Sequence, residues 1–146
     1  MDVSQRICRV VSSEDEAKIF INFYKMRLKR EYTLFPVYSD DLNQNWLVVS
    51  GQSKQNSSFA AVYLKNCSNS KSNSGWINFG LGFKKNETNS KLFYIDEIVE
   101  IKSKKHLYPS VVNTGGLLRS SISTVSQYQS NSSYFQDLDS YYFYKT

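Results

Sequence analysis

The sequence predicts an α+β fold with a mostly antiparallel sheet, one long N-terminal helix and one or two shorter helices. The chain has 146 residues, a length that suits one hydrophobic core. Hydrophobic residues make up 40% of it and aromatic residues 15%, so large rings can build much of that core. Short alternating segments bounded by polar turns outnumber segments with helical spacing. We therefore expect residues 1–146 to form a single domain.

The first two elements are the best defined. Residues 5–11 are a short apolar run with β-branched members, which is typical of a strand. Ser13 and Glu16 then have the spacing of a capping box, in which a hydroxyl and a carboxylate bond the free N–H groups of a helix start. Apolar residues recur at helical spacing from there onward. The pattern predicts a long helix over residues 14–30.

A hairpin and a short helix are expected next. Residues 32–38 alternate aromatic and aliphatic side chains, and residues 46–49 form a compact apolar run. A polar segment separates the two, as in an antiparallel hairpin. Residues 57–65 begin with serines and continue with apolar residues, which indicates a short second helix.

The second half begins after a Ser/Asn-rich tract at residues 66–75, which we expect to be a mobile loop. Residues 76–83 and 92–101 alternate in hydropathy and predict a second antiparallel hairpin. Residues 117–129 have a helical period that indicates a third helix, although their Ser and Thr content disfavours it. An aromatic C-terminal segment, residues 134–146, ends the chain.

The C-terminal segment is the most unusual feature of the sequence. Four aromatic residues follow one another: Tyr141, Tyr142, Phe143 and Tyr144. They indicate either a last strand that completes a sheet or a docking peptide that inserts its rings into a partner, because Tyr and Phe are common interface anchors. Both interpretations remain open at this stage.

The charge is moderately basic, with a net charge of +5 and an isoelectric point near 9.1. Basic side chains gather at Lys25, Arg27, Lys29 and Arg30, where they could form an electrostatic rim for a partner. This charge is compatible with a nucleic-acid partner but does not require one.

Catalytic signals are sparse. His106 is the single histidine, and no nucleophile or cysteine signature flanks it. No cysteine pair has metal-ligand spacing, so we predict no metal, no cofactor and no catalytic residue. Acid–base chemistry by His106 with Lys104, Lys105 and Tyr108 is the one enzymatic alternative. A non-catalytic protein is therefore favoured over an enzyme.

The sequence also favours an intracellular location, cytoplasmic or nuclear. The N-terminus has no signal-peptide pattern, and no run approaches the ~20 apolar residues of a membrane span. Cys8 and Cys67 do not form a disulfide framework, so we expect both thiols to be reduced.

These observations favour a non-catalytic binding subunit or adaptor that acts through protein–protein contacts in a larger assembly. Its partner would be another protein, held by the C-terminal aromatic residues and the basic cluster. An alternative is an RNA or single-stranded DNA binding protein that uses a basic, aromatic-bearing sheet. A second alternative is a small toxin or a toxin-neutralising protein. The sequence leaves the partner and the oligomeric state open.

Overall fold

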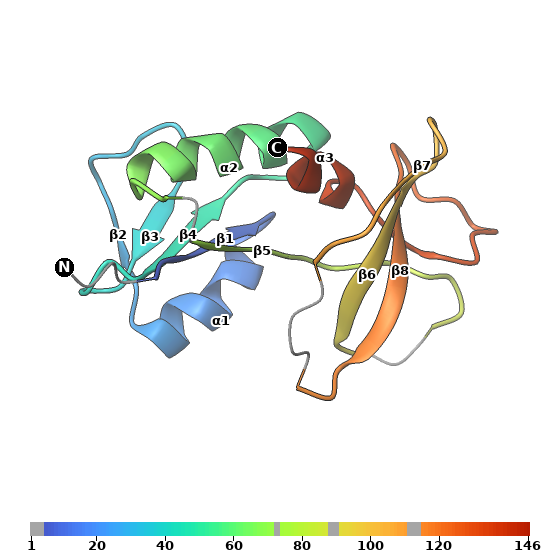
Figure 1. Ribbon diagram of the computed structural model, residues 1–146, viewed down its shortest axis with the longest axis horizontal. Coiled ribbons are helices and arrows are strands. Elements are labelled where there is room, and N and C mark those ends of the chain that lie inside the picture. The colour runs from blue at the N-terminus through green and yellow to red at the C-terminus, as the bar shows by residue number, and fades with distance from the viewer. Residues whose placement is uncertain (1–4, 72–73, 88–90, 111–114) are drawn as a thin grey trace. The chain divides into compact units, whose positions relative to one another are not determined.

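The computed structural model describes residues 5–71, 74–87, 91–110 and 115–146, which fall into two compact units (Figure 1). Unit 1 comprises Met1–Gly80 with Thr146, and unit 2 comprises Leu81–Lys145. Unit 1 contains β1 (Ile7–Val11), α1 (Glu14–Tyr24), β2 (Arg27–Leu28), β3 (Val37–Ser39), β4 (Asn45–Val49), α2 (Lys54–Cys67) and β5 (Gly75–Phe79). Unit 2 contains β6 (Phe93–Glu100), β7 (Lys105–Leu107), β8 (Leu118–Thr124), β9 (Phe135–Asp137) and α3 (Ser140–Lys145).

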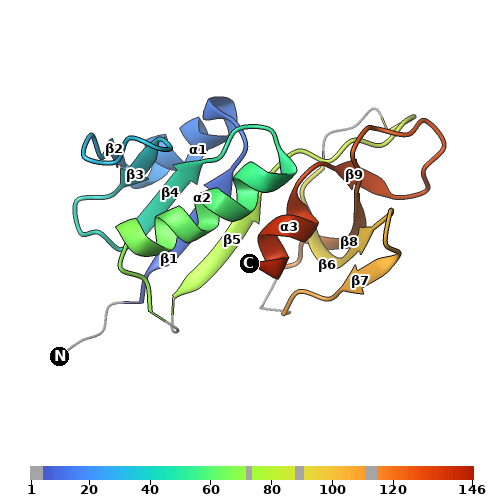
Figure 2. The same cartoon turned by 90° about the horizontal axis from the view of Figure 1, so that it is seen from above.

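Unit 1 is a mixed sheet between two helices. Its strand order is β2-β3-β4-β1-β5, with β1 parallel to both β4 and β5 and with β2 and β3 antiparallel to their neighbours. Figures 1 and 2 show α1 on one face of this sheet and α2 on the other. Parallel strands need long crossover connections, and α1 and α2 lie within those connections. The central strands β1 and β4 are therefore covered on both faces and are buried almost throughout.

The core of unit 1 forms where α1 packs on the sheet. Its buried members are Val11, Ala17, Met26, Leu47 and Val49, and partly buried aromatic residues of α1, β3 and β5 surround them. Two of these rings, Phe20 and Phe79, meet edge to face with centroids 5.1 Å apart. This packing fixes the first turn of α1 against the end of β1.

Unit 2 is a second mixed sheet, with strand order β7-β6-β8-β9. Strands β6, β8 and β9 are parallel, and β7 is antiparallel to β6. The core is built by Ile98, Ile122 and Tyr141, so α3 packs on the sheet through its first aromatic residue. The β6–β8 register shifts between Ile95 and Glu97, as at a β-bulge.

The predicted fold class is wrong in two respects. Both sheets are mixed rather than mostly antiparallel, and the described part of the chain has no long N-terminal helix. The predicted start of α1 is confirmed, but the helix has 11 residues and ends at Tyr24. Lys25 adopts a left-handed conformation with φ of 53°, and Met26 then turns into the core. None of the helices in the described ranges combines the length and hydropathy needed to cross a bilayer.

The two predicted hairpins have different outcomes. The first is confirmed, because β3 and β4 pair antiparallel. The second is wrong, because β5 pairs parallel with β1 in unit 1 whereas β6 belongs to the sheet of unit 2. Alternating hydropathy identifies a half-buried strand but not its partner, which explains the error.

The remaining segments also differ from expectation. Residues 118–124 of the predicted third helix form β8, in keeping with the fit of Thr and Ile to strands. The Ser/Asn-rich tract is shorter than expected, because α2 continues to Cys67 and Ser68 is buried. Residues 72–73 of that tract lie outside the described residues.

Candidate functional site

The carboxyl ends of β1 and β4 form the first candidate site. The chain leaves β1 toward α1 on one face of the sheet and leaves the neighbouring β4 toward α2 on the other face (Figure 2). Ligands of open α/β sheets bind at such a divergence, outside the carboxyl ends of the strands. The Ser50 amide donates to the Val11 carbonyl over 2.8 Å and joins the two strand ends. Gly51, with φ of +75°, then turns the chain toward α2.

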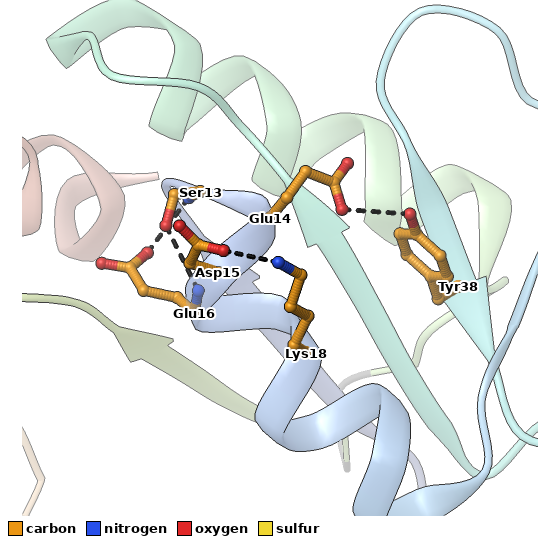
Figure 3. Close-up of polar contacts among 6 residues, drawn as sticks. All are labelled: Ser13, Glu14, Asp15, Glu16, Lys18 and Tyr38. Atoms are coloured by element: carbon orange, nitrogen blue, oxygen red, sulfur yellow. Dashed lines mark hydrogen bonds and ion pairs between the residues drawn. The ribbon is translucent and has the colours of Figure 1, made fainter.

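The first turn of α1 holds one carboxylate in a fixed position (Figure 3). The Glu16 amide donates to Ser13 Oγ over 3.2 Å, which caps the helix. In return, Glu16 Oε2 accepts from the Ser12 amide at 2.8 Å, the Ser12 hydroxyl at 2.9 Å and the Ser13 amide at 3.1 Å. Three donors on one oxygen orient the whole carboxylate.

The second oxygen of Glu16 is the chemically available one. Glu16 is only 6% exposed. Oε1 nevertheless forms no hydrogen bond or ion pair with any residue that the structure describes, and Figure 3 shows it pointing away from Ser13. An oriented carboxylate with a free oxygen can accept a hydrogen bond or a proton from a ligand or from water.

The other acids of this turn are engaged elsewhere. Asp15 pairs with Lys18 over 2.7 Å, and the hydrogen bond from Lys18 lowers the pKa of Asp15. Glu14 accepts from the Tyr38 hydroxyl at 3.2 Å. Burial and the Glu14 carboxylate raise the pKa of that phenol. Glu16 is therefore the acid of the turn best placed to meet a ligand.

A second candidate site lies at the carboxyl ends of the parallel strands in unit 2. Glu100, Thr124 and Asp137 end β6, β8 and β9, lie in register with one another and are buried. Thr124 Oγ1 donates to Asp137 Oδ1 over 2.8 Å and accepts from the Tyr141 amide at 3.0 Å. Asp137 Oδ2 accepts from the Ser140 amide at 2.9 Å. Burial raises the pKa of Asp137, so this carboxyl group retains its proton to a higher pH than an exposed one.

Two aromatic rings lie beside this row in unit 2. Phe83 and Tyr128 meet with centroids 5.4 Å apart and are 48% and 50% exposed. The Phe83 amide and carbonyl both pair with Gln136 over 2.8 Å, directly before Asp137 in the chain. Half-exposed rings held by the backbone offer a planar ligand a stacking surface.

The structure places the four predicted C-terminal anchors in α3. Tyr141 is buried against Ile98 and Ile122, and Tyr142 meets it ring to ring. Phe143 is half-buried, and Tyr144 is exposed but donates its hydroxyl to the Tyr108 carbonyl over 3.0 Å. The predicted last strand accounts for Phe135–Asp137 only, and the four rings lie on a helix.

The predicted basic rim is spread over several local contacts. Lys25 caps the end of α1, and Arg27 in β2 pairs with Asp41 over 3.3 Å. Lys29 lies 6.0 Å from the Trp46 ring, and Arg30 is exposed. No contact in the described part of the chain joins these four side chains to one another.

His106 meets a carboxylate that the sequence did not indicate. Its Nδ1 lies 2.9 Å from Glu97 Oε1, and the Tyr108 hydroxyl donates to the same oxygen over 3.4 Å. The hydrogen bond from His106 lowers the pKa of Glu97. Across the described ranges, no three His, Cys, Asp or Glu side chains are grouped so that they could hold a metal ion.

Comparison with solved structures relates this fold to enzymes. No family model matches the sequence, and no curated protein is significantly similar to it. The 5′-methylthioadenosine/S-adenosylhomocysteine nucleosidase of Colwellia psychrerythraea 34H, in complex with adenine, has a TM-score of 0.73 at 10% identity, over 97% of this chain and 76% of that one. The corresponding S. pneumoniae nucleosidase with a transition-state inhibitor has a TM-score of 0.70 at 9% identity, over 95% and 77%. A futalosine hydrolase mutant of Helicobacter pylori has a TM-score of 0.66 at 8% identity, over 95% and 81%.

At these identities the likeness establishes a shared fold. The proteins that share it are nucleosidases and a hydrolase, which are catalytic. The prediction of a non-catalytic adaptor or complex subunit, with its nucleic-acid and toxin alternatives, is therefore wrong, as is the preference against an enzyme. The sequence contains one usable signal for the site, an acidic residue on the first helical turn after a buried strand, which the capping-box pattern by itself explains as a helix cap.

Proposed function

We propose that this protein binds a purine nucleoside and hydrolyses its N-glycosidic bond. The observation that carries the proposal is Glu16, a buried carboxylate at the carboxyl end of the central parallel strand, one of whose oxygens has no partner among the described residues. The shared fold supports the choice of reaction, because the structures that it resembles act on 5′-methylthioadenosine and S-adenosylhomocysteine or on futalosine.

The reaction needs a proton acceptor for water. The water oxygen attacks the anomeric carbon of the ribose, the carbon–nitrogen bond breaks, and its electron pair leaves with the base. Glu16 Oε1 accepts a proton from the attacking water, and the departing base takes up a proton at a ring nitrogen. Three hydrogen bonds to Oε2 keep the accepting oxygen in one position, which lowers the cost of orienting it during the reaction.

Unit 2, taken by itself, carries two rings that suit contact with a purine. The half-exposed rings of Phe83 and Tyr128 could stack against a purine.

The test compares two glutamates in the same helical turn. The full chain is incubated with 5′-methylthioadenosine, S-adenosylhomocysteine or adenosine, and released adenine is measured by chromatography. Glu16→Gln keeps an oxygen for the capping bonds but loses the charge, so we expect the rate to fall about a hundredfold or more. Glu14→Gln makes the same charge change at an exposed position, and we expect it to retain the wild-type rate.

Two results would contradict the proposal. One is adenine release by the wild type that does not exceed the rate of Glu16→Gln. The other is an equal loss of activity in Glu14→Gln and Glu16→Gln, which would trace the effect to the charge of the turn rather than to the oriented carboxylate.

A further inference from the structure

Gln136 joins two segments of unit 2 that are far apart in the sequence. It lies in the middle of β9 and is 1% exposed. Its backbone amide and carbonyl both pair with Phe83, each over 2.8 Å. Its side chain extends to a different segment, the connection between β8 and β9.

The side-chain amide of Gln136 forms the same two hydrogen bonds with the Gln129 backbone that a neighbouring strand would form. Gln136 Oε1 accepts from the Gln129 amide at 2.6 Å, and Nε2 donates to the Gln129 carbonyl over 2.7 Å. Both polar atoms of a buried amide are thus satisfied by one residue. A donor and an acceptor side by side fix both the position and the direction of the Gln129 backbone.

The two hydrogen bonds to Gln129 restrain the position of the neighbouring residue Tyr128. Residues 126–131 are exposed. Gln129 directly follows Tyr128, and Phe83 is held by the backbone of the same Gln136. Gln136 is therefore hydrogen-bonded to one residue of the ring pair and to the chain neighbour of the other, and the two ring centroids are 5.4 Å apart.

We infer that Gln136 is a positioning residue for ring binding, which holds Tyr128 against Phe83 as a preformed stacking surface for a purine base. The inference rests on the proposed function for its choice of a purine ligand, and Gln136 and both rings lie in unit 2. A preformed surface spares the ligand the entropic cost of ordering the connecting segment, so the residue acts on affinity.

Of the side chains compared at position 136, only glutamine can form both hydrogen bonds to Gln129. Glutamate has no N–H donor and would face the Gln129 carbonyl with a second acceptor. Methionine has nearly the same length and leaves the backbone pair with Phe83 in place, but it forms neither bond to Gln129. Gln136→Met therefore removes the side-chain pair alone. Gln127→Met is the matched control, because Gln127 is an exposed residue of the same segment.

The experiment measures the local structure and the ligand separately. Amide hydrogen exchange by NMR reports the Gln129 N–H, which we expect to lose protection in Gln136→Met and to keep it in Gln127→Met. Adenine affinity and the kinetics with 5′-methylthioadenosine report the ring pair. We expect the Kd and KM of Gln136→Met to rise about tenfold with kcat within about twofold, in line with the size of base–aromatic stacking.

A double variant separates positioning from general stability. If Gln136 acts through Tyr128, Gln136→Met adds no further loss of affinity in a Tyr128→Ala background. Unchanged affinity in Gln136→Met, or full additivity with Tyr128→Ala, overturns the inference while the proposed function stands. A wild type that neither binds nor cleaves a nucleoside overturns the proposed function, and this inference with it. If Gln136→Met does not fold, Gln136→Leu takes its place, because leucine also forms neither bond to Gln129, with the same expectations for Gln129 exchange and for Kd.

Discussion

Arg9 is a buried positive charge in the sheet of unit 1 that forms no ion pair with a carboxylate of the described residues. The side chain is 2% exposed, and its guanidinium carbon lies 4.4 Å from the Tyr24 ring centroid and 5.4 Å from that of Phe20. Asn45 Oδ1 accepts one N–H at 3.1 Å. The planar cation is therefore stabilised mainly by the aromatic faces of α1.

Lysine at this position should be a poor substitute, because a compact ammonium cannot lie flat on two rings. We expect Arg9→Lys to lower the free energy of unfolding by about 2 kcal/mol, the size of a desolvated cation–π contact. Urea unfolding followed by tryptophan fluorescence measures the change. Arg30→Lys at an exposed position serves as the control, and an equal loss in both variants would exclude the stacking explanation.

The N-cap hydroxyl of Ser13 makes a second prediction at this scale. Ser13→Ala removes the acceptor of the Glu16 amide but leaves the bonds that Glu16 accepts from backbone N–H groups. We expect a loss of about 1 kcal/mol in the free energy of unfolding, as for other N-cap substitutions. Ser133→Ala, at an exposed serine, should change the same measurement by less than half of this amount. A larger loss in Ser133→Ala would contradict the capping argument.

At the scale of the elements, the sequence predicts where a helix or strand begins better than where it ends or which strand it pairs with. The start of α1 depends on local chemistry, because Ser13 and Glu16 bond each other within one turn. Its end depends on tertiary packing: helical spacing continues past Tyr24, but the burial of Met26 and the pairing of Arg27 with Ser39 stop the helix. Tertiary packing overrides propensity at this point.

The same distinction between local contacts and tertiary packing explains which residues of the candidate site could be predicted from the sequence. Glu16 was visible as a capping acid, because its spacing from Ser13 is local. The row that contains Thr124 and Asp137 was not visible, because it exists only after β8 and β9 pair in parallel. Likewise, nothing local relates Phe83 to Tyr128, which Gln136 brings together.

The junction of β8, β9 and α3 should make unit 2 sensitive to pH through Asp137. Burial raises its folded pKa above the ordinary value of 3.8, so the folded state binds more protons than the unfolded state in the interval between the two values. The free energy of unfolding therefore falls as the pH rises from 3.8 through the folded pKa. Asp137→Asn should lack this part of the slope in urea unfolding measured by circular dichroism at a series of pH values. An unchanged slope would assign the pH dependence to another group.

The β6–β7 pair makes a prediction of opposite sign for Glu97. The hydrogen bond from His106 is the largest cause of its lowered pKa, so removal of the imidazole should return that pKa toward the ordinary 4.5. NMR titration of the Glu97 carboxyl carbon in His106→Ala measures the shift directly. Lys105→Ala removes a charge from the same strand without touching the hydrogen bond, and it should leave the titration close to that of the wild type. An equal upward shift in both variants would indicate long-range charge as the cause.

At the scale of the whole molecule, the division into two compact units predicts two cooperative unfolding transitions. Both tryptophans, Trp46 and Trp76, lie in unit 1, so fluorescence follows that unit, whereas far-UV circular dichroism follows the strands and helices of both. We expect the two urea curves to differ, because probes that report different cooperative units do not coincide. Ser13→Ala, in unit 1, should shift the midpoint of the fluorescence curve. Asp137→Asn, in unit 2, should leave the fluorescence curve unchanged and shift only the transition of unit 2 in the dichroism curve. Coincident curves in the wild type and in both variants would show instead that the chain unfolds as one unit.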